Sequence, residues 1–233
     1  MPGRKLKIFS LIFIIIIAVV FCVYFTIGLL SGSFGDKIGV VEISGVITES
    51  KDPMEDIIRF KEDDSVKGVI IRINSPGGSV APSQEIYKEV KKLRAKKRVY
   101  VSMGSVCASG GYYIATAGEK LYAMPSTITG SIGVIMEQVV VEDLLKKIGM
   151  QSNTIKSGTF KDAGSPFRKM KDEEKAYFQS ILDNIHQQFI KDVALERKMT
   201  IEKVRTFADG KIFTGIDAKS MGLIDNIGTF YDT

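Results

Sequence analysis

Residues 67–78 read KGVIIRINSPGG, an apolar run that ends in a proline–glycine loop. The near-continuous run of β-branched residues is typical of a strand buried on both faces of a parallel sheet. Proline fixes one φ angle and the two glycines permit positive φ, so the end of the stretch predicts a sharp turn. Apolar residues then recur at helical spacing through residues 86–93, with lysines on the opposite face.

The same order of strand, loop and helix recurs outward from this stretch, and it predicts an α/β domain. No fixed-period repeat of the solenoid type is present. We expect further strands at 38–43, 98–103, 120–124, 131–136 and 152–155, and helices at 52–63, 109–117, 141–148 and 171–198.

A second glycine-rich motif, Ala108-Ser109-Gly110-Gly111, follows the expected strand at 98–103. Its small residues would let a substrate carbonyl approach Ser109, and the Gly110 amide would point to the same place. An amide from the proline–glycine loop would complete an oxyanion hole. Each motif alone is more often structural, as a tight helix contact or an ordinary turn. Together, each after a buried strand, they favour a hydrolytic serine.

A hydrolytic serine needs a base. The only histidine, His186, lies in a polar part of the expected 171–198 helix, where a solvated or capping role is the simpler interpretation. Lys161 is the other candidate. A lysine acts as a base only where burial favours its neutral form. We therefore expect a tight, partly apolar pocket around Lys161, with Asp162 turned away, although periodicity alone makes Lys161 an ordinary surface lysine.

Composition excludes several other classes of protein. Cys22 and Cys107 are the only cysteines, and no CxxC or CxxH spacing for a metal occurs. Cys107 has no base beside it in the sequence and is expected to be a small buried residue. The 32 basic and 27 acidic residues give a net charge of +5. The positive charge follows solvated helix faces without interleaved aromatic residues, which argues against nucleic-acid binding.

The N-terminal part predicts a membrane anchor. Residues 8–30 are uncharged and long enough to cross a hydrocarbon core of about 30 Å. The basic residues in the tail 1–7 favour a cytoplasmic N-terminus, with a linker at 31–37 and an external domain at 38–233. The alternative is a cleaved signal peptide, which would have a shorter apolar region and a small-x-small cleavage site.

Four segments carry a resemblance to a known family. NSPGG, SVCASGGYYIA, TITGSIGV and IKSGTFKDAGSPFR resemble the signal peptide peptidase A family of membrane-bound serine proteases, over about residues 38–227. The resemblance implies that Ser109 is the nucleophile, that Lys161 is the base, and that Ser131 hydrogen-bonds the lysine. It also implies that Gly77 and Gly110 lend their amides to the oxyanion.

The resemblance further implies a Clp/crotonase-like fold of repeated ββα units, preceded by one N-terminal transmembrane helix. It implies a homo-oligomeric ring on the membrane, hydrophobic peptide substrates such as released signal peptides, and no cofactor or metal. Longer single-domain members of the family carry a C-terminal extension, and tandem members carry two repeats. The sequence at hand ends at Thr233 and has one repeat.

Three alternatives remain in view. A crotonase-like acyl-CoA enzyme would keep the two amides, but it would need carboxylates, and none flanks the two loops. A non-catalytic membrane scaffold would not require Ser109, Ser131 and Lys161 to be intact. A Clp-type Ser-His-Asp triad would need a suitably placed histidine, and none lies between Ser109 and Lys161.

Overall fold

The structure is a computed structural model that describes residues 2–31 and 36–233, with the side chains of 12–26 and 36–233. It forms two compact units, Met1–Lys37 and Ile38–Thr233. Residues 32–35, the central part of the expected linker at 31–37, lie outside the described residues.

The first unit contains one helix, α1 (Pro2–Ser31), which includes the expected apolar span at 8–30. The large apolar side chains described on α1 are exposed. In a search limited to the described residues, no helix reaches the length and apolar character needed to cross a membrane.

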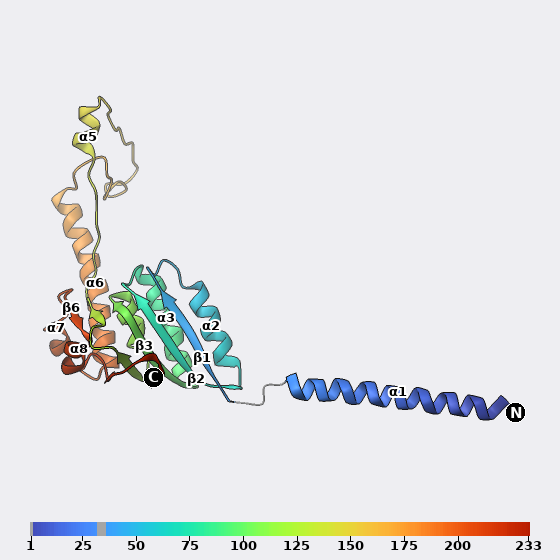
Figure 1. The fold of residues 1–233 in the computed structure, drawn as a ribbon. Coiled ribbons are helices and arrows are strands. Elements are labelled where there is room, and N and C mark those ends of the chain that lie inside the picture. The colour runs from blue at the N-terminus through green and yellow to red at the C-terminus, as the bar shows by residue number, and fades with distance from the viewer. Residues whose placement is uncertain (1, 32–35) are drawn as a thin grey trace. The chain divides into compact units, whose positions relative to one another are not determined.

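The second unit is a mixed α/β fold (Figure 1). Within the described residues, seven strands form one sheet in the order β1-β2-β3-β4-β7, with β5 paired to β3 and β6 paired to β5. The strands are β1 (Lys37–Ser44), β2 (Val66–Ser75), β3 (Arg98–Ala108), β4 (Lys120–Ala123), β5 (Ile128–Gly130), β6 (Ile212–Thr214) and β7 (Asn226–Ile227). The helices are α2 (Lys51–Glu62), α3 (Val80–Arg94), α4 (Gly110–Ala115), α5 (Glu142–Lys147), α6 (Asp172–Glu196), α7 (Ile201–Arg205), α8 (Gly215–Met221) and the 3₁₀ turn η1 (Phe230–Asp232).

Strand β3 pairs with three other strands, β2, β4 and β5. Its first half pairs in parallel with β4, and its second half pairs in parallel with β5, where Ala108 lies opposite Gly130. The register between β2 and β3 shifts from Ile73–Met103 to Ser75–Cys107, which marks an irregularity near the ends of both strands. The strand runs beyond the expected 98–103 to Ala108, so that it ends at the serine motif.

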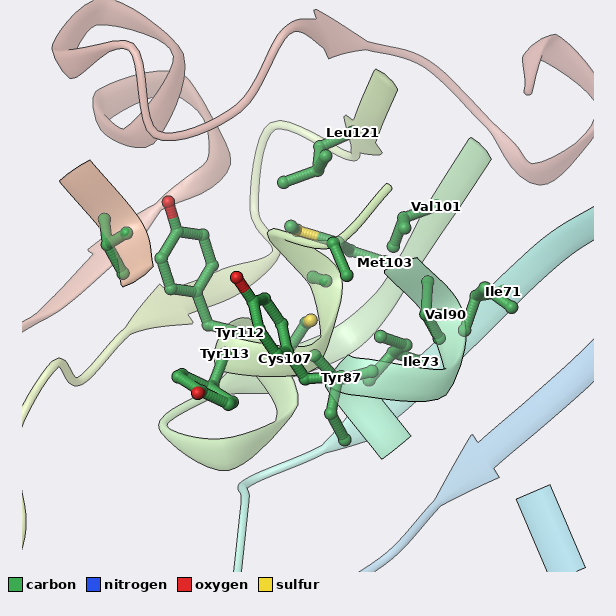
Figure 2. Close-up of a cluster of buried hydrophobic side chains, with 14 of the residues drawn as sticks. Ile71, Ile73, Tyr87, Val90, Val101, Met103, Cys107, Tyr112, Tyr113 and Leu121 are labelled. Carbon is green, nitrogen blue, oxygen red and sulfur yellow. The ribbon is translucent and has the colours of Figure 1, made fainter. Parts of the chain in front are cut away.

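The core lies between the sheet and the helices that cover it. In β2 the buried apolar residues alternate with half-buried ones, so one face of this strand is buried more fully than the other, and burial on both faces, as the sequence pattern predicted, is not complete. In β3 the consecutive residues 101–104 are all buried. Both strands meet the apolar stripe of α3. Figure 2 shows Cys107 among these side chains, and it is fully buried. The sequence interpretation of Cys107 as a small buried residue is therefore confirmed.

Two expected strands are wrong. Residues 131–136 and 152–155 form no regular secondary structure, and the strand nearest to the first range is β5, which stops before Ser131. Gly130 and Ser131 have φ angles of 81° and 52°, which break an extended chain. Apolar residues beyond this point, such as Ile135 and Ile155, are 80% and 96% exposed. These apolar residues resemble a strand in sequence, but they are not buried in the core of this chain.

Candidate active site

The register of β2 and β3 brings the two glycine-rich motifs together. Ser75, at the end of β2, lies opposite Cys107, near the end of β3. Because neighbouring parallel strands end at the same edge of a sheet, the loop after β2 and the turn after β3 become neighbours. The sequence alone predicted both motifs after buried strands, and the sheet supplies their contact.

Ser109 sits in a strained turn between β3 and α4. Its φ and ψ angles are 51° and −123°, a conformation that non-glycine residues rarely adopt and that costs about 1–3 kcal/mol. The Ser109 amide donates to the Gly130 carbonyl at 2.9 Å, and its carbonyl accepts from the Tyr113 amide at 2.9 Å. The backbone is thus fixed on both sides, as in the strand–turn–helix arrangements that present a nucleophile.

Glycines around Ser109 permit backbone contacts that no side chain would allow. A Cβ atom on Gly77 would lie 2.8 Å from Ser109 Cβ, and one on Gly110 would lie 2.5 Å from Ser83 Oγ. A Cβ atom on Gly78 would lie 2.1 Å from the Ile47 carbonyl oxygen. The proline–glycine loop therefore packs directly against the serine turn.

The hydrogen bonds of the backbone amides at this junction bear on the expectation that Gly77 and Gly110 bind the oxyanion. The Gly77 amide donates to Ser75 Oγ at 3.1 Å, so it turns toward its own strand. Ile47 forms the two neighbouring hydrogen bonds: its amide donates to the Gly77 carbonyl, and its carbonyl accepts from the Ser79 amide. Across residues 2–31 and 36–233, the Gly78 and Gly110 amides have no hydrogen-bond acceptor. The Gly77 amide is therefore occupied by the Ser75 side chain, whereas the Gly78 amide beside it is free to donate to another group.

Two cavities adjoin Ser109. The smaller, of about 40 Å³, has Ser109, Gly78 and Gly110 at its rim and is otherwise mainly apolar. Its apolar lining comes from α3, α4, α6 and the segment after β5, through Val80, Tyr113, Val134, Ile185 and Phe189. This cavity can accept one apolar side chain beside the serine.

The larger cavity, of about 570 Å³, shares Ser109 and Gly78 with the smaller one. Ser131 lines it, and the Ser131 amide is fixed by a 2.8 Å hydrogen bond to the Lys211 carbonyl. His186 and Asp209 supply further polar groups. The structure thus brings Ser109 and Ser131, both named by the family resemblance, to one cavity.

Lys161 lies elsewhere in this chain. It belongs to a segment, residues 134–171, that we call the arm; Figure 1 shows α5 of this arm beyond the far end of α6. The Lys161 side chain is exposed, and it lines neither cavity at Ser109. The expected tight pocket around Lys161 is therefore not formed within this chain, because the arm is in contact with few other elements.

The Asp162 carboxylate is turned away from Lys161, as expected. It pairs with Lys156, and it accepts from Arg168 Nε at 2.8 Å. Arg168 also donates to both carboxylate oxygens of Glu174, at 2.6 and 2.9 Å. Arg168, helped by the Lys171 amide, lowers the pKa of the buried Glu174 carboxyl to about 2. These ion pairs fix the base of the arm to α6.

His186 lies on the long helix as expected, but the solvated or capping role expected for its side chain is wrong. It lies on α6 and lines the larger cavity, and its Nε2 atom is buried. Within the described part of the chain, Nε2 has no hydrogen-bond partner. One feature of the sequence could have indicated that His186 is buried: it is next to Ile185 and three residues before Phe189, which belong to the apolar stripe of the expected helix.

Other chemistry is not supported at this site. Burial raises the pKa of the Cys107 thiol, which keeps it protonated and unreactive at neutral pH. Among the residues that the structure describes, no group of three or more His, Cys, Asp or Glu side chains is placed to hold a metal ion.

The chain is similar to known peptidases. A family model described as Peptidase family S49 matches residues 91–233, and one described as Clp protease matches residues 41–129. The chain is 41% identical over 197 residues to a putative protease of Synechocystis sp., covering 84% of this chain and 71% of that protein. It is 35% identical over 211 residues to a putative signal peptide peptidase SppA of Enterococcus faecium, covering 84% and 61%.

A similar fold occurs among solved structures. A mutant ClpP1 of Listeria monocytogenes superposes with a TM-score of 0.58 at 18% identity, over 83% of this chain and 92% of that chain. At this identity the likeness concerns the fold alone.

Proposed function

This chain is a serine peptidase of peptidase family S49, and we propose that it hydrolyses hydrophobic peptides with a dyad of Ser109 and Lys161. The observation that carries the proposal is the strained turn at Ser109, which lies beside an apolar cavity. The rim of this cavity also holds two amides, of Gly78 and Gly110, that have no acceptor in the described part of the chain. This combination suits an acyl-transfer reaction on a peptide carbonyl.

The proposed reaction is an acyl transfer through a serine ester. Ser109 Oγ attacks the peptide carbonyl carbon while the neutral Lys161 amine takes the hydroxyl proton. The amides of Gly78 and Gly110 hold the resulting oxyanion. When the tetrahedral intermediate collapses, the protonated lysine returns the proton to the leaving amine. Water then attacks the acyl-enzyme by the same steps, and Ser131 orients the lysine amine.

The position of Lys161 favours a dyad assembled from more than one copy of the chain. The arm that carries Lys161 exposes many apolar side chains, which is unusual for a surface that stays in water. Those that are more than two-fifths exposed include Ile135, Met136, Val139, Leu144, Ile148, Met150, Ile155, Phe160 and Phe167. The Clp-like fold is in keeping with an oligomeric assembly. We infer that a second copy covers the arm and that the ring brings Lys161 to a neighbouring Ser109.

The substrate proposal rests on the two cavities. The smaller cavity selects an apolar side chain next to the scissile bond. An extended peptide can pair its backbone with residues 133–136, which follow β5 and have no regular secondary structure, by strand addition. Released signal peptides are rich in apolar residues and fit this requirement.

The membrane location is part of the proposal. Residues 8–30 are uncharged, and the basic tail precedes them, so we propose a single-pass anchor with residues 38–233 outside the cell membrane. Such an anchor would hold the peptidase where hydrophobic peptides accumulate.

Labelling tests the central assignment. The full-length protein in detergent is treated with a fluorescent phosphonate that reacts with activated serines, followed by peptide mapping. We expect label on Ser109 and loss of peptide hydrolysis in proportion to labelling. Label on another serine, with Ser109 unmodified, would remove Ser109 as the nucleophile. A stable protein that neither labels nor cleaves apolar peptides would favour the non-catalytic scaffold.

A further inference from the structure

His186 is a polar group without a structural task. Its Nε2 atom is buried, and no acceptor or donor for it exists among the described residues. A buried polar atom without a partner costs free energy, so most such atoms are paired. An imidazole that only packed α6 against its neighbours would be replaced by an apolar side chain at a gain in stability. The unpaired nitrogen therefore points to a partner that arrives from outside the chain.

The surroundings of His186 identify where that partner lies. His186 lines the larger cavity together with Ser109, Ser131 and Asp209, whereas the apolar neighbours on its helix, Ile185 and Phe189, line the smaller cavity. One helix thus presents an apolar wall to one cavity and an imidazole to the other. The Asp209 carboxylate is paired with Lys211 Nζ at 2.6 Å, and it does not bind His186 Nε2.

We propose that His186 is a specificity-determining residue, whose Nε2 forms a hydrogen bond with a hydroxyl or carboxamide side chain of the bound peptide. This inference rests on the proposed peptidase function. An imidazole nitrogen donates in one tautomer and accepts in the other, and hydroxyl and carboxamide groups can serve either. A peptide bound across Ser109 then places an apolar side chain in the smaller cavity and a Ser, Thr, Asn or Gln side chain in the larger one.

Matched peptides test the proposal. Thr and Val have nearly the same shape, as do Asn and Leu, so each pair reports the hydrogen bond alone. The pairs are placed at each of three positions on either side of the scissile bond, and kcat/KM is measured with the full-length enzyme in detergent. At one position we expect Thr over Val, and Asn over Leu, by about 5- to 10-fold, the value of one neutral hydrogen bond. No polar preference at any position would overturn the proposal without any mutation.

Three variants separate recognition from packing. His186→Leu should bring the Thr/Val ratio close to 1; because the ratio compares two peptides on one enzyme, a change in activity common to both peptides cancels. His186→Gln should keep most of the ratio, because its carboxamide reaches the position of Nε2, whereas His186→Asn, which reaches only the Nδ1 position, should not. Asn184→Ala, an exposed change on the same helix, is the matched control and should leave the ratio unchanged.

The outcomes distinguish this inference from the proposed function. A wild-type ratio in a folded His186→Leu enzyme would overturn the specificity role and leave the peptidase assignment intact. Loss of kcat on every peptide in both His186→Leu and His186→Gln, with Lys161→Arg active, would make His186 the base and overturn both proposals. Retained hydrolysis by Ser109→Ala would overturn the proposed function through the nucleophile.

Discussion

Gly77 lies in direct contact with Ser109: a Cβ atom on Gly77 would be 2.8 Å from Ser109 Cβ and 2.7 Å from the Gly110 amide nitrogen. Its φ angle of 100° is also one that residues with a side chain rarely adopt. Gly77 thus acts as the spacer that lets the loop after β2 close onto the serine turn, although its own amide is bound to Ser75.

Replacing this spacer should disable the enzyme. We expect Gly77→Ala to lower kcat/KM by about 100-fold or more, because a methyl group would push Ser109 and the Gly110 amide out of position. Gly68→Ala in β2, the strand that leads into this loop, is the control, since its added Cβ would meet only ordinary contacts beginning at 3.5 Å. Equal activities of the two folded variants would contradict the close packing.

The nucleophile can be separated from its buried neighbour. Ser109→Ala should reduce hydrolysis by more than about 10³-fold with little change in the melting temperature, because it removes one oxygen at a partly exposed turn. Cys107→Ala should keep kcat, since the thiol is buried and protonated. Thermal melts by circular dichroism provide the folding control, and an inactive but folded Cys107→Ala would challenge the assignment.

The base is best tested by two variants measured side by side. Lys161→Arg should be as inactive as Lys161→Ala, because a guanidinium keeps its proton near neutral pH. If Ser109 and Lys161 form the dyad, kcat/KM should also rise with pH as the lysine loses its proton. His186→Gln should then retain its turnover. An active Lys161→Arg enzyme would end the dyad hypothesis, and an inactive His186→Gln would then assign the base to His186.

Mixing experiments test whether the dyad is shared between copies. Neither Ser109→Ala nor Lys161→Ala should hydrolyse peptides alone. If each site takes Ser109 from one copy and Lys161 from another, coexpression of the two variants should restore part of the activity. Coassembly is verified with two affinity tags. Coassembled variants that stay inactive would show that both residues must come from the same chain.

The ion pairs at the base of the arm predict an acid-sensitive contribution to stability. Arg168 holds the Glu174 pKa near 2, below its usual value of about 4.3, so the contribution is present above pH 4.3 and is lost as pH falls toward 2. The melting temperature of Glu174→Gln should therefore lie below that of the wild type at pH 6, and the gap should narrow between pH 4.3 and 2. A gap that stays constant with pH would contradict this.

Topology offers an independent check of the membrane proposal. Protease added to cells without a wall should digest residues 38–233 if the basic tail stays in the cytoplasm. A cytoplasmic marker protein must remain intact in the same sample. Digestion only after membrane lysis would reverse the orientation, and recovery of the chain without residues 1–31 in the soluble fraction would favour a cleaved signal.

Sequence patterns predicted most of the sheet but failed where burial was absent. The runs at 67–73 and 98–103 became β2 and β3 because apolar residues at strand spacing must be buried on the sheet. The apolar residues at 131–136 and 152–155 resembled strands equally well, yet several of them are exposed on the arm. A single-chain pattern cannot tell a residue buried in its own core from one left for another partner.

The sequence by itself determined the α/β class and the glycine-rich turn at Ser109, because local spacing and glycine placement dictate such turns. Lys161 was singled out by the family resemblance, since spacing alone makes it an ordinary surface lysine. Only the tertiary structure decided which amides are available and which polar groups reach Ser109. Those outcomes depend on the β2–β3 register, on the bond that Ser75 makes with the Gly77 amide, and on the packing of α6. The tertiary structure brought His186 to the larger cavity that Ser109 also lines and left Lys161 outside it, because α6 packs on the core whereas the arm extends beyond it.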